Sequence, residues 1–480
     1  MTGPWWRGGT IYHVYPRSFQ DDSGDGVGDL AGIRRRLPYL SWLGVDAVWL
    51  SPFYRSPMAD FGYDVSDHCD VDPLFGTLGD FDALAAEARR LGLRLILDYV
   101  PNHTSSGHPW FHEHPERYLW RDVPNNWLSA FGGPAWSERG GRFYYHAYLP
   151  EQPDLDWRRA DVREAMLAVL RFWIARGADG FRLDALRQVG KDAEWRDNPP
   201  NPDWREGDDD YDKLIPEFSA DGPLAHEVSR LLREAAGDKL LIGELYLPIE
   251  RLVRYYASGI DLPANFHLLT TPWRPEAIAA LVERYEAALP AGAWPNWVLS
   301  NHDRPRLSRR VGAEQLGNAA LLLLTLRGTP TLYYGDEVGL EEVEVPVPRD
   351  PWDGGRRDPC RSPMPWDDSP NAGFTKAKPW LPIGPGNAKR NVAAQQQDPA
   401  SLLALVRRAL QVRRQFADAG YRTVKAEGDL LAYRRGDVLV ALNLGAGEVA
   451  VRADGEVVVG SGELVGGELR LGPHQGAVVR

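Results

Sequence analysis

The sequence predicts an α/β protein: a (β/α)8 TIM barrel with an inserted subdomain after the third strand and a C-terminal antiparallel β domain. Two observations predict the barrel. Short apolar strands alternate with amphipathic helices, and the alternation continues over roughly 400 of the 480 residues. A third observation, the loss of helical periodicity in the last part of the chain, predicts the β domain.

The first 100 residues contain the strand–helix unit most clearly. Strands are expected at 11–15, 47–50 and 93–98, because these runs are short and apolar. A helix is expected at 80–91, where the apolar positions recur at helical spacing: Phe81, Leu84, Ala85, Ala88 and Leu91. Apolar strands that alternate with helices are typical of a parallel sheet with its helices outside.

The pattern breaks between residues 101 and 160, which are rich in Pro, Asn, Trp, His and Gly. A structureless loop of that length is uncommon inside a compact domain, so an inserted subdomain is expected here. Beyond it we expect a helix at 162–176 and further strands at 180–184, 240–244, 296–300 and 329–334.

The expected domains are a barrel formed by residues 1–100 and 161–400, the insertion 101–160, and a C-terminal β-sandwich domain 401–480. The last includes a linking helix near 402–416, followed by Val- and Leu-rich runs at 438–442 and 456–459. The Pro- and Asp-rich segment 346–399, with Arg349-Asp350-Pro351-Trp352-Asp353, fits either a disordered linker or a loop. Its aromatic residues and its place after the last strand favour a loop over the barrel mouth.

Charge and cysteine content restrict the partners and the compartment. The chain has 55 basic and 67 acidic side chains, a net charge of −12, which argues against a nucleic-acid or anionic-membrane partner. Cys69 and Cys360 cannot form a disulfide scaffold, and the start of the chain lacks the apolar run of a signal peptide. The longest Leu-rich stretch, 319–326, is too short to span a bilayer. We therefore expect a cytoplasmic protein, as a monomer or small homo-oligomer.

Charged side chains end four of the expected strands: Asp98, then Arg182 with Asp184, then Glu244, then Asp303 after His302. The C-terminal ends of barrel strands meet at one rim, where active sites of this fold lie. Each acid alone fits a helix cap or a surface ion pair equally well, but their joint placement predicts a functional site.

Gathered carboxylates suit cleavage of a glycosidic bond, which needs one protonated acid and one ionised carboxylate. Metal-dependent hydrolysis is the competing use of such a cluster. It commonly needs a His-rich set of ligands at fixed spacing, and the sequence contains neither His-x-His nor His-Glu-x-x-His.

Four motifs, Asp98–Thr104, Gly180–Ala185, Gly243–Tyr246 and Asn301–Asp303, resemble the signature regions of glycoside hydrolase family 13, the α-amylase family. Two further motifs resemble those of its oligo-1,6-glucosidase and α-glucosidase subfamily, Gln152–Leu155 and Arg357–Trp366. Within the second, Ser362 and Pro365 stand where most members have Thr and Gln.

The resemblance implies a retaining α-glucosidase, with Asp184 as the nucleophile, Glu244 as the acid and then the base, and Asp303 as a stabiliser of the distorted sugar. The residues agree with these roles. Arg182 lies two residues before Asp184 and so shares its face, which favours an ionised nucleophile. Glu244 follows an apolar run, where burial would raise its pKa towards that of an acid.

The resemblance also implies a sugar-binding set. His103 and His302 would donate to sugar hydroxyls, although either alone fits a core histidine equally well. Asp60 and Arg361 would hold the terminal 4-hydroxyl while Tyr63 stacks on the ring, giving a closed pocket and exo action on maltose-, isomaltose- or sucrose-type substrates. Phe131 and Tyr148 align loosely with aromatics near the same site, or are subdomain core.

In the subfamily, the residue after the nucleophile correlates with linkage: Val with α-1,6 and Thr with α-1,4. Ala185 decides neither. A sugar isomerase or transglucosylase, of the trehalose synthase or sucrose isomerase type, would share all three acids and remains the alternative. A non-catalytic transporter subunit would need a membrane segment and tolerate lost acids, so it is disfavoured.

An acidic loop at 21–29 begins like an EF-hand, but its twelfth position is Gly32 and not Glu. The loop fits an ordinary Asp/Gly turn or a metal site. The mutual repulsion of its acids and the resemblance to the subfamily favour a structural Ca²⁺ or Mg²⁺, with the hydrolysis itself needing no cofactor. The candidate ligands are Asp21, Ser23, Asp25, the Val27 carbonyl and Asp29.

Overall fold

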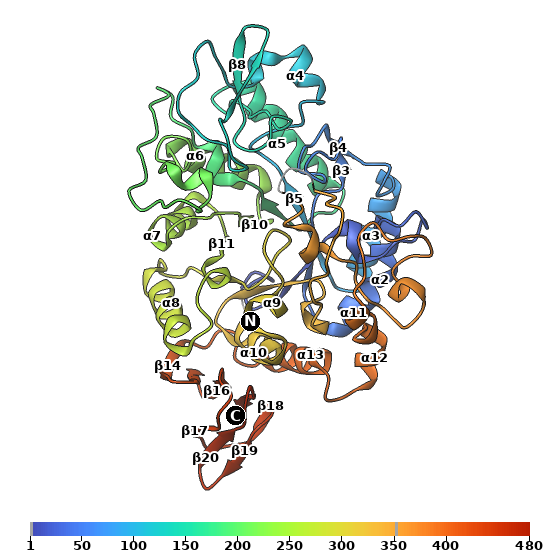
Figure 1. Ribbon diagram of the computed structural model, residues 1–480, viewed down its shortest axis with the longest axis vertical. Coiled ribbons are helices and arrows are strands. Elements are labelled where there is room, and N and C mark those ends of the chain that lie inside the picture. The colour runs from blue at the N-terminus through green and yellow to red at the C-terminus, as the bar shows by residue number, and fades with distance from the viewer. Residues whose placement is uncertain (1–2, 351–353) are drawn as a thin grey trace.

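The computed structural model describes residues 3–350 and 354–480. Its centre is a closed barrel with the strand order β1-β13-β12-β11-β10-β9-β5-β2, and every neighbouring pair in it is parallel (Figure 1). The predicted fold class is therefore confirmed. The strands are β1 (Ile11–Val14), β2 (Ala47–Leu50), β5 (Arg94–Tyr99), β9 (Gly180–Leu183), β10 (Leu240–Gly243), β11 (Leu262–Asn265), β12 (Asn296–Val298) and β13 (Thr329–Tyr333).

The sixth barrel strand, β11, is the one that the sequence analysis missed. Its residues are Leu262-Pro263-Ala264-Asn265, with no β-branched or aromatic side chain and with a proline inside. Such a run has little β-propensity of its own. Its conformation is imposed by its neighbours β10 and β12, with which it pairs on either side.

Helices surround the barrel: α2 (Leu30–Leu43), α3 (Leu78–Arg90), α5 (Ala160–Ala175), α6 (Pro223–Ala236), α8 (Pro275–Ala288), α10 (Leu316–Thr325) and α13 (Leu402–Arg413), with the short α1 (Pro16–Phe19), α7 (Ile249–Leu252) and α9 (Leu307–Val311). Helix α3 begins two residues before the expected position because Thr77 and Asp80 form a reciprocal capping box. One apolar core lies between strands and helices, and a second fills the barrel with Ile11, Trp49, Ile96 and Ile242.

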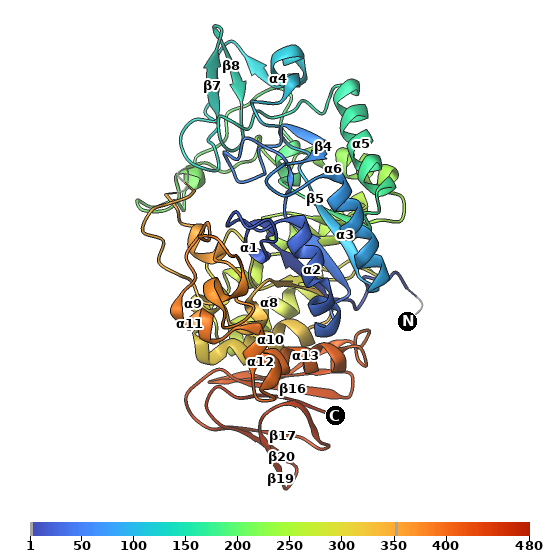
Figure 2. The same cartoon turned by 90° about the vertical axis from the view of Figure 1, so that its right-hand side faces the viewer.

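The segment between β5 and α5 forms a small sheet of its own, ordered β6 (Trp120–Arg121), β8 (Arg142–Tyr145) and β7 (Trp136–Arg139), beside α4 (Pro109–Glu113). A separate apolar cluster that includes Leu119, Trp127 and Tyr145 supports it. Figures 1 and 2 show this segment at the end of the molecule opposite the C-terminal strands. A second small sheet joins β3 (Tyr54–Arg55) and β4 (Asp67–Val71). The expected boundaries of the domains stay predictions.

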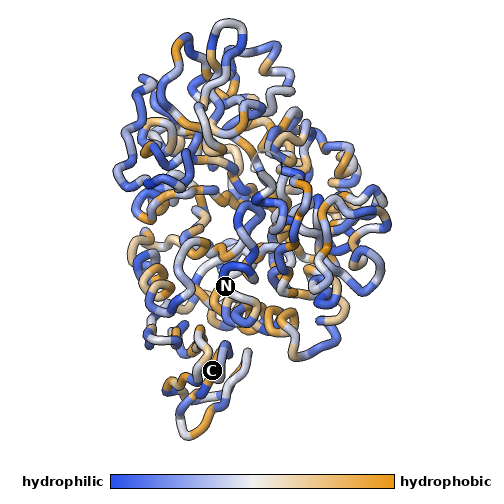
Figure 3. The backbone as a smooth tube through the Cα atoms, viewed as in Figure 1, coloured by the Kyte–Doolittle hydropathy of each residue, from blue (hydrophilic) through white to orange (hydrophobic). Residues whose placement is uncertain are grey.

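The C-terminal strands form two antiparallel sheets. The first contains β14 (Tyr421–Glu427), β15 (Leu430–Arg435), β16 (Val438–Asn443), β21 (Gly476–Val479) and β18 (Val457–Gly460); the second contains β17 (Val449–Arg452), β20 (Glu468–Leu471) and β19 (Glu463–Val465). Helix α10 joins them to the barrel. It is buried almost all round and packs on α13, β16 and β21. Figure 3 shows hydrophobic stretches where α10 lies.

The chain after β13 packs against the barrel, as the loop interpretation requires. It includes α11 (Pro385–Lys389) and α12 (Val392–Gln397), and its buried side chains include Met364, Trp366 and Phe374. Trp366 Nε1 donates to the Phe19 carbonyl at 2.7 Å. Of the motif 349–353 noted in the sequence, Pro351, Trp352 and Asp353 lie outside the described residues. Along the described chain, no helix combines the length and the apolar character that crossing a membrane requires.

Glu337 is a fully buried acid just after β13, in the 3-10 turn Asp336–Val338. Its Oε1 accepts hydrogen bonds from Tyr12 Oη at 2.6 Å and Tyr39 Oη at 2.8 Å. Burial raises the pKa of Glu337 to about 7, although the two tyrosines oppose the shift. The protonated carboxyl is therefore the form that the fold favours.

We expect Glu337→Gln to change how stability depends on pH. Because the pKa of Glu337 is raised in the folded state, this residue makes its full contribution to stability below the unfolded pKa of about 4.3. That contribution is lost as pH rises towards 7. Because glutamine does not titrate, the free energy of unfolding of the variant relative to wild type should rise by a few kcal/mol between about pH 5 and pH 8. Denaturant titrations at both pH values measure it. The exposed Glu448→Gln is the control, and parallel pH curves for Glu337→Gln and wild type would contradict the assignment.

Candidate active site

Arg182 lies at the centre of the candidate active site. Its Nη1 is 2.8 Å from Asp98 Oδ1 and 2.6 Å from Asp184 Oδ1, and its Nη2 is 2.6 Å from Glu244 Oε1. The three acids come from the C-terminal ends of β5, β9 and β10, which are adjacent in the barrel. One buried guanidinium thus holds together three carboxyl groups that lie far apart in the sequence.

The protonation of this cluster follows from its charge balance, since one positive group faces three acids. Burial raises the pKa of Asp98 to about 6, against the lowering effect of Arg182. Burial also raises the pKa of Asp184 well above its usual value, and again Arg182 opposes the shift. The substrate-free site therefore favours retaining a proton among these carboxyl groups.

The backbone after β9 directs a donor at Glu244. Ala185 adopts the left-handed conformation (φ 47°), which residues other than Gly, Asn and Asp rarely adopt. Its N–H donates to Glu244 Oε2 at 2.8 Å. This contact and the one to Arg182 fix the position of the Glu244 carboxyl group. The expectation that burial keeps a proton on Glu244 stays a prediction.

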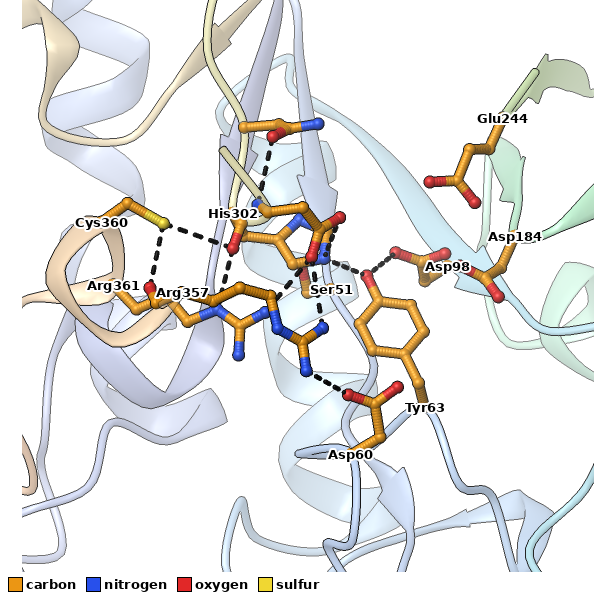
Figure 4. Close-up of polar contacts among 12 residues, drawn as sticks. Ser51, Asp60, Tyr63, Asp98, Asp184, Glu244, His302, Arg357, Cys360 and Arg361 are labelled. Atoms are coloured by element: carbon orange, nitrogen blue, oxygen red, sulfur yellow. Dashed lines mark hydrogen bonds and ion pairs between the residues drawn. The ribbon is translucent and has the colours of Figure 1, made fainter. Parts of the chain in front are cut away.

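Tyr63 connects the acid cluster to His302, at the other end of the site. Its Oη donates to Asp98 Oδ2 at 3.1 Å and is 2.9 Å from His302 Nε2, as Figure 4 shows. Burial lowers the pKa of His302 to about 3, so the ring is neutral at ordinary pH. Its Nε2 is also 3.3 Å from Asp303 Oδ2. The rings of Tyr63 and His302 are parallel, with their centres 5.4 Å apart, and polar contacts hold both of them.

Asp303 lies among cations. Arg361 Nη2 is 3.3 Å and Arg357 Nη1 is 3.5 Å from its Oδ1. Burial acts to raise the pKa of Asp303, but His302 and three nearby guanidinium groups bring it below its usual value. Asp303 is therefore ionised, whereas the raised pKa values of Asp98 and Asp184 favour their protonated forms. The two ends of the site thus differ in how readily their carboxyl groups ionise.

The structure changes the partner expected for Asp60. Arg357, and not Arg361, reaches this carboxylate, with Nη2 at 2.8 Å from Oδ1 (Figure 4). Arg361 follows one turn later, in the 3-10 helix Asp358–Arg361, and points inward. It donates from Nε to the His302 carbonyl at 2.8 Å, and its guanidinium lies 5.2 Å from the ring centre of Tyr15. Asp350 Oδ2 lies 2.5 Å from Arg357 and 3.4 Å from Arg361.

The remaining expected residues line the same region. His103 Nε2 lies 3.1 Å from Gln152 Nε2, and Gln152 donates to Asp60 Oδ2 at 3.1 Å. Tyr148 packs its ring edge against His103, with ring centres 5.5 Å apart. Phe131 contacts Tyr148 and lies 5.3 Å from the Arg357 guanidinium. The inserted segment therefore supplies one wall of the site.

All three expected catalytic acids and all eight expected sugar-binding residues belong to one connected network. The sequence analysis missed Arg357, Gln152 and Asp350 as members. Arg357 and Gln152 lie within motifs already identified, so their motif membership was a usable signal. Asp350 had no such signal, because only the packing of the loop after β13 brings it under the two arginines.

The carboxylates of the acidic loop accept hydrogen bonds from backbone N–H groups of the same loop. Asp21 accepts from the N–H groups of Gly24 (2.7 Å) and Gly26 (2.9 Å), and from the Ser23 hydroxyl (3.0 Å). Asp29 caps α2 through Gly32 and also accepts from Asp22 and Ser23, while Asp25 accepts only from the Val27 N–H. Among the described residues, no group of three or more His, Cys, Asp or Glu side chains is arranged to hold a metal. The metal site stays a prediction.

Comparisons with known proteins agree with this geometry. The family described as "Alpha amylase, catalytic domain" matches residues 13–419. A probable α-glucosidase of Rhizobium meliloti (strain 1021) is 42% identical, covering 90% of this chain and 87% of that protein. An oligo-1,6-glucosidase of Parageobacillus thermoglucosidasius is 33% identical over 90% and 88%. The crystal structure of XgtA, an α-glucosyl transfer enzyme, is 40% identical and superposes with a TM-score of 0.94 over 100% of both chains.

The metal prediction can be tested at Asp25, the exposed member of the loop that makes one hydrogen bond within it. If an ion binds, Asp25→Asn should lower the melting temperature by a few degrees in Ca²⁺ or Mg²⁺, because a ligand that binds only the folded state stabilises it by mass action. The difference should vanish after exhaustive chelation. Asp22→Asn, also exposed and outside the expected ligand set, is the control. Equal melting of Asp25→Asn and wild type in both buffers, with no metal in elemental analysis, would refute the site.

Proposed function

Because the chain belongs to the α-amylase family of glycoside hydrolases, we propose that it is an exo-acting, retaining α-glucosidase that releases glucose from the ends of short oligosaccharides. The names of the relatives, α-glucosidase and oligo-1,6-glucosidase, support this activity. The chemistry of the acid cluster supports it independently, since two carboxyl groups close to one another are what glycoside hydrolysis needs.

The contact between Asp60 and Arg357 carries the exo assignment. It joins the loop after β2 to the loop after β13 at 2.8 Å, and Arg357 also reaches Asp303. A charged bridge of this kind offers hydrogen bonds to the hydroxyls of a terminal glucose. It also occupies the space that a further sugar unit would need. A chain end then fits the site, whereas the interior of a polymer does not.

In the proposed reaction, the Asp184 carboxylate attacks the anomeric carbon while Glu244 gives a proton to the leaving oxygen. Water then hydrolyses the glucosyl ester, with Glu244 as the base. Arg182, which contacts both acids, would stabilise whichever of them is charged at each step. The substrate-free site favours a proton near Asp184, so substrate binding would have to place that proton on Glu244.

Transfer to a sugar hydroxyl is the second candidate, favoured by the full-length similarity to XgtA. Transfer and hydrolysis share the glucosyl ester and differ in whether water or a hydroxyl attacks it. Products formed from concentrated maltose measure the partition. A panel of maltose, isomaltose, sucrose, trehalose and soluble starch measures linkage preference, which Ala185 leaves open.

The remaining assignments are parts of the same proposal. The substrate is a small oligosaccharide, no nucleic acid or membrane takes part, and the protein acts as a monomer or small homo-oligomer. A cytoplasmic location is supported by the two cysteines, both of which are free thiols.

Asp184→Asn should remove nearly all glucose release from maltose, because an amide cannot form the glucosyl ester. Its melting curve should show a folded protein, since asparagine can still accept a hydrogen bond from Arg182. Glucose release and thermal unfolding are the two measurements. A folded variant that keeps more than a few per cent of wild-type activity would defeat the assignment of Asp184.

Asp60→Ala should lower kcat/KM for maltose by at least about tenfold. A hydrogen bond to a charged group contributes roughly 1.5–3 kcal/mol, and about 1.4 kcal/mol corresponds to tenfold. Arg357→Lys should give a similar loss, because an ammonium cannot span Asp60 and Asp303 as the guanidinium does. Arg390→Lys, at an arginine of the same segment that pairs with Glu341 and with none of the site residues, is the matched control.

The wild type should release glucose first from maltotriose and digest starch slowly. Iodine staining followed beside glucose release distinguishes the two modes of cutting. Rapid loss of staining with little free glucose would mean internal cleavage. The exo assignment and the proposed role of the Asp60–Arg357 bridge would then both be wrong.

A further inference from the structure

A chain of buried polar contacts runs from Lys191 to His103. The Lys191 ammonium lies 2.6 Å from Asp154 Oδ2 and donates to Asn102 Oδ1 at 2.8 Å and to the Gln188 carbonyl. Asn102 Nδ2 is in turn 3.1 Å from His103 Nδ1. Asn102 and Asp154 are fully buried, and His103 and Lys191 nearly so. The proposed reaction uses none of these groups except His103.

The ammonium determines which way the Asn102 amide faces. It has three hydrogens and no acceptor, and three oxygens receive them. Turning the amide over would place its NH2 group against the ammonium and leave a buried donor unmet, which is costly away from water. The Asn102 oxygen therefore faces Lys191, and its NH2 group faces His103.

A second amide, Gln152, is fixed in the same way on the other side of the ring. Its Oε1 accepts from the Leu149 N–H at 3.1 Å, and its Nε2 donates to Asp60 Oδ2 at 3.1 Å. The imidazole of His103 thus lies between two NH2 groups, and the Tyr63 carbonyl is 3.2 Å from its Nε2.

The two neutral tautomers of His103 satisfy different numbers of these contacts. With the proton on Nε2, Asn102 donates to Nδ1 and Nε2–H donates to the Tyr63 carbonyl, while the Gln152 NH2 group keeps only its bond to Asp60. With the proton on Nδ1, this N–H meets the Asn102 NH2 group, the Tyr63 carbonyl loses its donor, and one bond from Gln152 remains. Burial lowers the pKa of His103, so the neutral ring is the form in question.

The geometry points to Asn102, held by Lys191, as a positioning residue that fixes His103 in its neutral Nε2–H tautomer. The Nε2–H meets the Tyr63 carbonyl in the substrate-free site and turns to a substrate hydroxyl when sugar binds. The identity of that hydroxyl rests on the proposed function. The tautomer itself does not, because it follows from contacts inside the protein.

Asn102→Asp is the diagnostic variant because it keeps the size of the side chain and reverses one contact. One carboxylate oxygen still accepts from Lys191, while the other accepts from His103 and so draws the proton to Nδ1. The charged and titratable groups that face His103 are otherwise unchanged: Asp60, Asp154, Lys191, His68 and Tyr148. The new carboxylate raises the pKa of His103, and protonation at low pH restores the Nε2–H donor.

Nitrogen NMR of ¹⁵N-histidine-labelled full-length protein reads the tautomer, with His103→Gln to assign the signal. We expect a protonated Nε2 in wild type and a protonated Nδ1 in Asn102→Asp. Beside this, kcat/KM for maltose should fall about tenfold in Asn102→Asp at neutral pH, as a misdirected buried hydrogen bond implies. The ratio of variant to wild type should recover as pH is lowered. Asn102→Ala should lose activity without that recovery.

The controls separate folding, tautomer and function. Asn391→Asp makes the same exchange at the cap of α12 and should leave the ratio to wild type flat with pH. Melting temperatures identify any loss due to unfolding. A proton on Nδ1 in wild type overturns the inference whatever the activity. A reversed tautomer with unchanged kcat/KM overturns its link to substrate. Absence of α-glucosidase activity in wild type refutes the proposed function, and the NMR measurement still decides the tautomer.

Discussion

The site depends on one interaction, the contact of a single buried guanidinium with three carboxyl groups. Without Arg182, Asp98, Asp184 and Glu244 would be acids confined in a region from which water is largely excluded, and each would repel the others. With it, the cluster has fewer positive than negative groups, so its carboxyl groups share a proton instead of all ionising. A retaining glycosidase needs that condition, with one acid and one ionised carboxylate a short distance apart. The adjacent positions of β5, β9 and β10 make the contact possible.

The opposite end of the site is closer to charge balance, with two arginines from one loop facing three carboxylates. Arg357 contacts Asp60, Asp303 and Asp350, and Arg361 contacts Asp303 and Asp350. Asp350 lies beneath both guanidinium groups and gives them a fixed partner in the absence of sugar. This matters because an unpaired arginine next to the acid cluster would be drawn towards it. Neutral groups, Tyr63 and His302, lie between the two ends of the site, and their hydrogen bonds connect the ends without adding charge.

The sequence predicts the barrel and its acids well because both follow local rules. Apolar strands next to amphipathic helices can pack in few ways, and residues at strand ends such as Asp98 and Glu244 must then meet at one rim. Strand β11 was not predicted because Pro263 and Asn265 have no strand preference of their own. The resemblance implied that Arg361 acts together with Asp60, but Arg357, one helical turn earlier, forms the ion pair with Asp60, because loop packing decides which arginine reaches it. No spacing rule reveals the contact of Lys191 with Asn102, since it joins residues 89 positions apart.

Three segments without long regular structure form the walls around the acids: the loop after β2, the inserted segment and the loop after β13. Where these segments meet at the site, ion pairs and hydrogen bonds between them fix how one lies against the next. Asp60 to Arg357 and Gln152 to Asp60 each cross from one of these segments to another, and Lys191 to Asp154 joins the inserted segment to the loop after β9. Buried pairs of this type contribute little net stability, yet removing one partner leaves a charge without compensation. The walls are therefore specified by polar complementarity and the barrel by apolar packing. A change in one wall residue can in consequence disorganise the site while the barrel keeps its fold.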